Sequence, residues 1–122
     1  MQATEILSRY GAGERHFQHA NLQEAELTNC NLSGVDLSYA DLRQSRIGKT
    51  NLHRACLRSA DLSETILWGT DLSEADLYQA ILREADLSGA KLMRSRLDGA
   101  NLVKTSLCGA NLASTSLTHT LL

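Results

Sequence analysis

The sequence predicts an all-β solenoid, a chain wound into stacked coils around a narrow apolar core. From residue 22 to residue 122 every fifth residue is Leu, with Ile47 as the single exception, and Phe17 continues the series upstream. A spacing of five matches neither the 3.6-residue period of a helix nor the two-residue period of a flat strand. Repetition at a fixed short interval is typical of solenoids, in which each unit buries its apolar residue only against neighbouring units.

Two further regularities accompany each Leu. The residue two before it is small, most often Ala, and the residue directly before it is most often Asp or Asn. Residues two apart in an extended segment point to the same side, so the small residue and Leu share the inward face, where a larger side chain would overpack. We expect the Asp and Asn side chains to hydrogen-bond the backbone of turns rather than to act in catalysis.

Glycine takes the second position after Leu in five units, at Gly34, Gly69, Gly89, Gly99 and Gly109, and Asn29 is equivalent. This placement suits the second central residue of a type II turn, which needs a positive φ angle. The chain contains no Pro, as expected where the backbone N–H groups of one coil pair with the next. We therefore predict turns at these positions.

The resulting unit, A-[DN]-L-x-x, resembles the repeat of the pentapeptide-repeat family, and the lead-in from Tyr10 to Phe17 is similar to that of cyanobacterial members. The resemblance covers nearly the whole chain after residue 15. It implies four units per coil and a right-handed quadrilateral parallel β-helix. The twenty-two units of residues 17–122 then form about 5.5 coils, roughly 26 Å long at about 4.8 Å per coil.

The N-terminal residues are predicted to be a separate element. Segment 4–10 has the pattern of a short helix with three apolar residues on one face, ended by Gly11. The first coil of a solenoid needs a cover, because its exposed ladder edge would otherwise pair with other chains. We therefore divide the chain into an N-terminal capping helix with its lead-in, residues 1–16, and a pentapeptide-repeat β-helix, residues 17–122.

Composition limits the classes of function. The formal net charge is −2, and acidic residues alternate with Arg or Lys along the chain, so there is neither a basic surface nor a block of like charges. The sequence has no secretory h-region and no stretch that spans a membrane. Its three Cys do not form a disulfide framework. We expect a cytoplasmic protein that contacts neither nucleic acid nor a membrane.

No group of residues predicts an enzyme. A filled rod offers no cavity in which polar groups could converge. His16 and His19 are a weak candidate for a metal pair, and His53 near Cys56 is a weak candidate for a reactive thiol; ordinary surface residues are the better interpretation of both. We expect no catalytic residue, no metal and no cofactor.

A binding role remains, in one of two forms. The resemblance to cyanobacterial members implies an interaction scaffold in regulation, whereas some quinolone-resistance members of the family resemble B-form DNA and occupy the DNA site of gyrase. Mimicry of a duplex needs a nearly unbroken negative surface, which the alternation of acids with Arg does not provide. The sequence favours a non-enzymatic protein-interaction scaffold or regulatory binding module with an unknown protein partner. A DNA-mimic inhibitor or protector of DNA gyrase is the alternative.

Outward apolar side chains are rare and predict where a partner binds. Ile66 and Ile81 take the outward position before Leu, and the sole Trp, Trp68, also faces outward, with Tyr78 less firmly placed beside them. Exposed apolar clusters with an aromatic anchor are interface candidates, whereas scattered surface hydrophobes are ordinary. We hypothesise that these four residues form a protein-contact patch.

The C-terminal end is a second candidate contact. The last coil stops part-way with Leu117, Leu121 and Leu122 and with an almost uncharged rim. Unpaired backbone groups at such an edge invite pairing with another edge, and two chains meeting tail to tail would bury both with two-fold symmetry. We expect a weak tail-to-tail homodimer through these residues, although fraying of the last units would hide the edge equally well.

Overall fold

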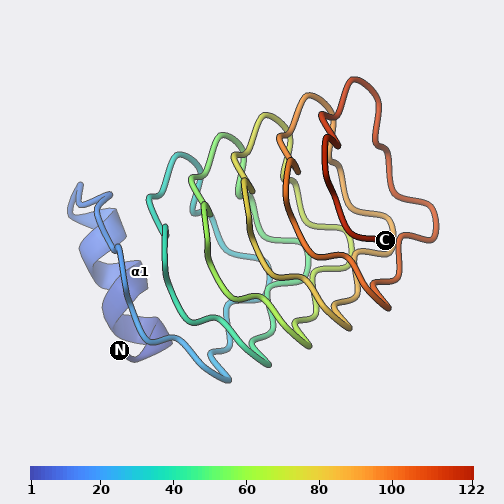
Figure 1. Ribbon diagram of the computed structural model, residues 1–122. Helices are drawn as coiled ribbons and strands as arrows, with labels where there is room; N and C mark the ends of the chain where they lie inside the picture. The colour runs from blue at the N-terminus through green and yellow to red at the C-terminus, as the bar shows by residue number, and fades with distance from the viewer.

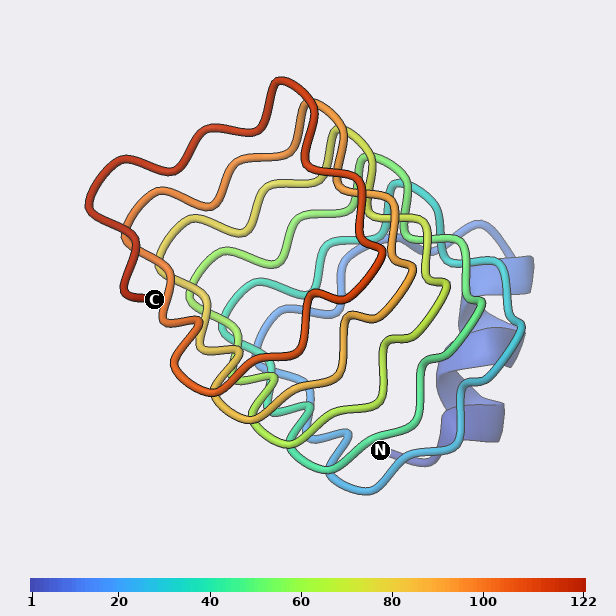
Figure 2. The same cartoon turned by 90° about the vertical axis from the view of Figure 1, so that its right-hand side faces the viewer.

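The computed structural model describes all residues from 1 to 122 as one helix followed by a stack of coils (Figure 1). Helix α1 spans Ala3–Gly11. Each coil after it takes twenty residues, because eighteen parallel bridges each join a residue to the one twenty positions further along the chain, from His16 with Asp36 to Asn101 with Leu121. The bridges are single, and the chain forms no longer strand. Figure 2 shows the coils lying over one another in register.

Each five-residue unit from residue 36 to residue 100 pairs four of its five backbone N–H groups with backbone carbonyls. The residue before Leu donates to the preceding coil, and Leu and the second residue after it donate to the following coil; for Leu37 and Tyr39 these two distances are 2.8 and 2.9 Å. The third residue after Leu closes a turn on the Leu carbonyl, as Ala40 does on Leu37 at 3.1 Å. In these units only the N–H of the residue directly after Leu has no backbone acceptor. A backbone N–H without any acceptor is costly, so another group is expected to accept it.

The Asp and Asn residues before Leu supply that missing acceptor. In eleven units their Oδ1 atom accepts the N–H of the residue directly after Leu, at 2.9–3.3 Å. The eleven are Asn21, Asn31, Asp36, Asp41, Asn51, Asp61, Asp71, Asp76, Asp86, Asn101 and Asn111. The prediction that these side chains serve the turn backbone is confirmed.

Asp71 allows a test of this role. Its Oδ1 atom accepts the backbone N–H of Ser73 at 3.0 Å and the Ser73 hydroxyl at 2.5 Å. Asp71→Ala should lower the free energy of unfolding by about 1 kcal/mol, because both donors lose their acceptor. Asp71→Asn, whose amide oxygen can still accept, should lose less. Urea unfolding followed by the fluorescence of Trp68 measures both, and equal losses would contradict the assignment.

The second residue after Leu has a positive φ angle in every unit from His19 to His119. Five of these residues are the predicted glycines, and sixteen others, at φ between 56° and 63°, are not glycine. The prediction of positive φ is confirmed, and it extends to all units. The number of glycines underestimates the number of positive-φ turns. The closing hydrogen bond and the buried Leu on either side hold other residue types in the left-handed region.

The Leu column forms the core. Every Leu or Ile of the series from Leu22 to Leu102 is at most 3% exposed. Where a polar residue takes the small position, its hydroxyl finds an acceptor: Ser45 donates to the Leu42 carbonyl of its own turn at 2.6 Å, and Thr70 donates to the Ile47 carbonyl of the preceding coil at 2.7 Å. No buried side-chain polar atom lacks a partner, so these substitutions cost the core little.

Helix α1 lies at the N-terminal end of the stack (Figure 1). Ile6 is fully buried and belongs to the same apolar cluster as Phe17, while the Tyr10 hydroxyl donates to the Ser33 carbonyl at 2.6 Å. The Arg9 guanidinium lies 5.0 Å from the centre of the Phe17 ring. At nine residues, this single helix has neither the length nor the apolar content of a membrane-spanning segment.

Candidate functional site

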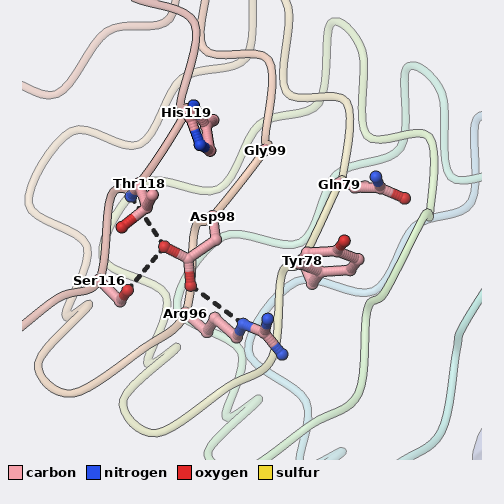
Figure 3. A pocket seen from close by; sticks show the side chains of 8 residues that line it. All are labelled: Tyr78, Gln79, Arg96, Asp98, Gly99, Ser116, Thr118 and His119. Carbon is pink, nitrogen blue, oxygen red and sulfur yellow. Dashed lines mark hydrogen bonds and ion pairs between the residues drawn. The ribbon is translucent and has the colours of Figure 1, made fainter.

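The largest surface hollow lies along one corner of the rod (Figure 3). It is an open groove of about 420 Å³, lined by Tyr78, Gln79, Arg96, Asp98, Gly99, Ser116, Thr118 and His119. These eight residues come from three successive coils, because positions twenty apart lie one above the other. We call this surface the Gly99 groove.

The groove exists because one column of side chains is interrupted. At this corner the second residue after Leu is Ser59, Gln79, Gly99 and His119 in successive coils. Gly99 places no side chain between Gln79 and His119, and Gln79 forms the floor, with its Cγ 3.1 Å from where a Cβ on Gly99 would lie. Figure 3 shows the side chains arranged around the backbone of Gly99.

Asp98 stands in a transposed position in its unit. Arg96 precedes Leu97 and Asp98 follows it, whereas in most units the acid or Asn precedes Leu. The Oδ1 atom of Asp98 accepts the Ser116 hydroxyl at 2.6 Å and the backbone N–H of Thr118 at 2.7 Å, and its Oδ2 atom accepts Nε–H of Arg96 at 3.0 Å. Ser116 occupies the place of an Asp or Asn before Leu, so Asp98 supplies from the preceding coil the acceptor that this turn needs.

These hydrogen bonds keep Asp98 ionised. The Ser116 hydroxyl makes the largest contribution, and together with the Thr118 N–H and Arg96 it lowers the pKa of Asp98 to about 2 from the ordinary 3.8, against an opposing effect of desolvation. A carboxylate that accepts several hydrogen bonds is favoured over its protonated form. The groove therefore contains a fixed negative charge at any pH in a cell.

The pKa of Asp98 predicts how stability depends on pH. Because the folded pKa is lowered, the carboxylate stabilises the fold above the ordinary value near 3.8, and this stabilisation is lost as the pH falls towards about 2. The melting temperature of Asp98→Asn should lie below that of the wild type at pH 7, and the difference should shrink towards pH 2. Scanning calorimetry from pH 2 to pH 7 measures it, with Glu24→Gln at an exposed position as the control. A difference that is constant with pH would contradict the assignment.

Tyr78 forms a rigid wall of the groove. Its ring is held between two guanidinium groups, with Arg58 4.6 Å and Arg96 4.4 Å from the ring centre. Each Arg is also paired with a carboxylate, Arg58 with Asp76 at 3.1 Å and Arg96 with Asp98 at 3.0 Å. Cation–π contacts with two guanidinium groups stabilise the observed position of the ring.

The structure separates one of the four predicted contact residues, Tyr78, from Trp68. Trp68 and Tyr78 follow Leu residues ten positions apart, which places them two sides of a twenty-residue coil from one another. Tyr78 lines the Gly99 groove, whereas Ile66, Trp68 and Ile81 line none of the three surface hollows. Ile81 is 38% exposed and Trp68 is 39% exposed. A role of these residues in binding a partner stays a prediction.

The position of Trp68 has a packing explanation. Its ring lies over Gly48 of the preceding coil, so closely that a Cβ on Gly48 would come 2.9 Å from the ring, and the Lys49 ammonium is 5.1 Å from the ring centre. The side chain thus covers a gap that Gly48 leaves in the wall of the rod.

The C-terminal candidates are exposed. Leu117, Leu121 and Leu122 are 41%, 57% and 83% exposed, and Leu121 forms the last bridge, with Asn101. The tail-to-tail homodimer stays a prediction.

Two of the other titratable candidates, His53 and His19, have partners of their own. His53 pairs through Nδ1 with the Ser73 hydroxyl at 2.8 Å, and burial is the largest of the effects that raise the pKa of the Cys56 thiol, which disfavours a reactive thiolate. His19 stacks on Tyr39, with ring centres 5.1 Å apart and planes 11° apart. All three Cys are free, and no three His, Cys, Asp or Glu side chains come together as metal ligands would.

Seven of the eight groove residues were not identified from the sequence as contact residues. Two features of the sequence mark this place. Asp98 follows Leu97 instead of preceding it, and Gly99 leaves out a side chain between Gln79 and His119, which lie twenty residues before and after it. Both become meaningful only when residues twenty apart are compared.

Comparisons with known proteins bear on the family and the fold. The family described as pentapeptide repeats (8 copies) matches this chain over three segments, residues 16–54, 55–92 and 90–122. One similar solved structure is the crystal structure of HetL, a pentapeptide repeat protein involved in heterocyst differentiation regulation in the cyanobacterium Nostoc sp. strain PCC 7120. The two sequences are 70% identical and the structures superpose with a TM-score of 0.93, over 94% of this chain and 48% of HetL. The chain thus spans about half the length of HetL.

Two other solved structures are more distant. A pentapeptide repeat protein from the thylakoid lumen of Arabidopsis thaliana is 24% identical with a TM-score of 0.65, over 86% of this chain and 67% of that one. Rfr23 from the cyanobacterium Cyanothece 51142 is 26% identical with a TM-score of 0.52, over 98% of this chain and 99% of that one. No curated protein sequence matches the chain.

Proposed function

Because the chain belongs to the pentapeptide-repeat family, whose fold is a right-handed β-helix, we propose that it is a non-enzymatic regulatory module that binds another protein. The observation that carries the proposal is the 70% identity to HetL over 94% of this chain, since HetL is involved in the regulation of heterocyst differentiation. The shared part is about half of HetL, so a partner recognised by the other half would not be shared.

The architecture suits recognition of a protein surface. Leu and small residues fill the rod, so the outward side chains alone are available to a partner. The ladder holds these side chains in columns, and successive members of one column are about 4.8 Å apart. A surface ordered before binding loses little conformational entropy when the complex forms.

The finer organisation is part of the proposal. Residues 17–122 form about 5.5 coils of a quadrilateral β-helix, and residues 1–16 cover its first coil, which the burial of Ile6 supports. We place the protein in the cytoplasm, a reducing compartment that suits the free thiols of its three Cys.

Mimicry of DNA is not favoured. Half of the twelve acidic side chains of residues 17–122 are paired with Arg, as Asp41 is with Arg43 at 2.7 Å and Asp76 with Arg58 at 3.1 Å. A surface that replaces duplex DNA needs unpaired negative charge at regular intervals. We expect no inhibition of the supercoiling activity of DNA gyrase at micromolar concentrations of this protein.

The regulatory role can be tested in Nostoc sp. strain PCC 7120 that lacks HetL. Expression of this chain should shift the heterocyst frequency towards that of the strain that keeps HetL, and the tagged chain should co-purify a protein that also co-purifies with HetL. Leu72→Asp, in which the core is disrupted, is the inactive control. An unchanged frequency together with no shared partner would refute the proposal.

A further inference from the structure

We propose that the Gly99 groove binds one aromatic side chain of the protein partner, Tyr or Trp, stacked against His119 at the level of Gly99. This inference rests on the proposed function, because it assigns the chemistry by which the partner is recognised. The arguments are the spacing of the column, a stack already present in it, and the charges of the walls.

The interrupted column leaves space for one ring. Gln79 and His119 lie two coils apart, which is about 9.6 Å at about 4.8 Å per coil. A ring at the level of Gly99 then lies about 4.8 Å from His119, within the range of roughly 4.5–7 Å at which aromatic rings stack. The flexible Gln79 side chain, whose Cγ lies 3.1 Å from where a Cβ on Gly99 would be, must turn aside to admit the ring. Gly99 itself offers only backbone there, and Figure 3 shows His119 on one side and Tyr78 on the other.

The same column already contains such a stack at its other end. His19 and Tyr39 are successive members of the column that continues through Gln79 and Gly99 to His119, since all of these positions differ by multiples of twenty. Their ring centres are 5.1 Å apart and nearly parallel at 11°. The corner therefore accommodates a ring one coil away from a His, and beside His119 the chain leaves that place to Gly99.

The walls favour a neutral ring. The two charged residues of the lining, Arg96 and Asp98, are paired with each other at 3.0 Å, so a charged guest of either sign would meet a like charge nearby. Tyr78, whose ring is contacted by both Arg58 and Arg96, is the one apolar residue of the lining.

Asp98 selects a ring that carries a hydrogen-bond donor. Its carboxylate has about four acceptor sites, and three hydrogen bonds, from Ser116, Thr118 and Arg96, are present. The remaining site can accept the hydroxyl of Tyr or the indole N–H of Trp, whereas Phe has no donor. At about 420 Å³ with Tyr78 as its one apolar residue, the groove suits a side chain presented by a protein better than a free apolar ligand.

The direct test is a titration of the isotope-labelled chain with N-acetyltyrosinamide, followed by amide chemical shifts. We expect saturable shifts at Gly99 and His119 with this probe and none with N-acetylleucinamide. In Gly99→Tyr the chain's own ring should fill the groove and abolish the response. This variant should fold, because Tyr39 has a φ angle of 60° at the equivalent position and the nearest atom to the new Cβ, at 3.1 Å, belongs to the flexible Gln79 side chain.

Gly89→Tyr is the matched control. Gly89 takes the same turn position on another corner, with a φ angle of 67° and no atom closer than 4.0 Å to an added Cβ, and this variant should keep the response. No shift at Gly99, equal shifts with both probes, or an undiminished response in Gly99→Tyr would each overturn the inference.

The partner found in the co-purification experiment separates this inference from the proposed function. Gly99→Tyr should weaken binding of that partner at least tenfold, and Gly89→Tyr should not. Equal binding by both variants would overturn the groove assignment and leave the regulatory role standing. A chain that binds the tyrosine probe at Gly99 but neither alters heterocyst frequency nor shares a partner with HetL would refute the proposed function instead.

Discussion

Leu72→Asp should abolish the folded β signal in circular dichroism and the cooperative thermal transition. Leu72 is 1% exposed and lies in the inward column between Leu52 and Leu92. A carboxylate there has no partner, and the cost of burying it is comparable with the whole stability of a small domain, roughly 5–15 kcal/mol. Since each coil is stabilised by its neighbours, the loss should spread along the stack.

Ile81→Asp is the matched control for that experiment. Ile81 is 38% exposed and takes the outward position before Leu82, where eleven other units have Asp or Asn. The new carboxylate can accept the N–H of Arg83, as Asp61 accepts that of Ser63 at 3.0 Å. We expect this variant to fold with unchanged or slightly raised stability. A cooperative transition retained by Leu72→Asp would show that the inward assignment of the Leu column is wrong.

Ile6→Ala should lower the free energy of unfolding by about 2–5 kcal/mol, the usual cost of truncating a fully buried Ile. Ile6 is 0% exposed and packs in the same cluster as Phe17 and Leu22. Ala is a better helix former than Ile, so a loss of stability must come from packing of α1 on the first coil and not from helix propensity. Urea unfolding measures it, with Thr4→Ala on the exposed side of α1 as the control.

The same variant tests whether α1 protects the first coil. If the helix detaches, the ladder edge beneath it becomes available to other chains, and light scattering should show a mass that rises with protein concentration more steeply than that of the wild type. A destabilised variant with the same concentration dependence as the wild type would mean that α1 adds stability without covering a reactive edge.

The features that repeat could be predicted from the sequence. A period of five identifies Leu as the inward residue, because only stacking of identical units can bury so isolated an apolar side chain. The turn at Gly34 and the structural role of Asp36 follow from residue types with strong local preferences. These predictions need no knowledge of which residues lie twenty positions apart.

The groove could not be predicted in this way, because it arises between coils. The acceptor for the Thr118 N–H comes from Asp98, and the space beside Gly99 depends on where Gln79 and His119 point. The predicted contact patch treated outward residues as free, whereas Trp68 lies over Gly48 and Tyr78 lies between Arg58 and Arg96. Neighbours across coils, absent from any local pattern, decide which outward side chains are available.

Because each coil takes twenty residues, the position of a residue within its coil decides the side of the rod on which it lies. Inserting or deleting twenty residues would lengthen or shorten the stack while every later residue keeps its side, so columns such as that of Gly99 would stay aligned. Inserting five residues would keep every Leu inward but move all later units to the next side of the coil. An insertion between Gly99 and His119 would thus remove His119 from the column of Gln79 and Gly99. Insertions or deletions of five residues should therefore preserve the core and disrupt recognition. Those of twenty residues should preserve the core and the recognition surface, except at the inserted or deleted coil.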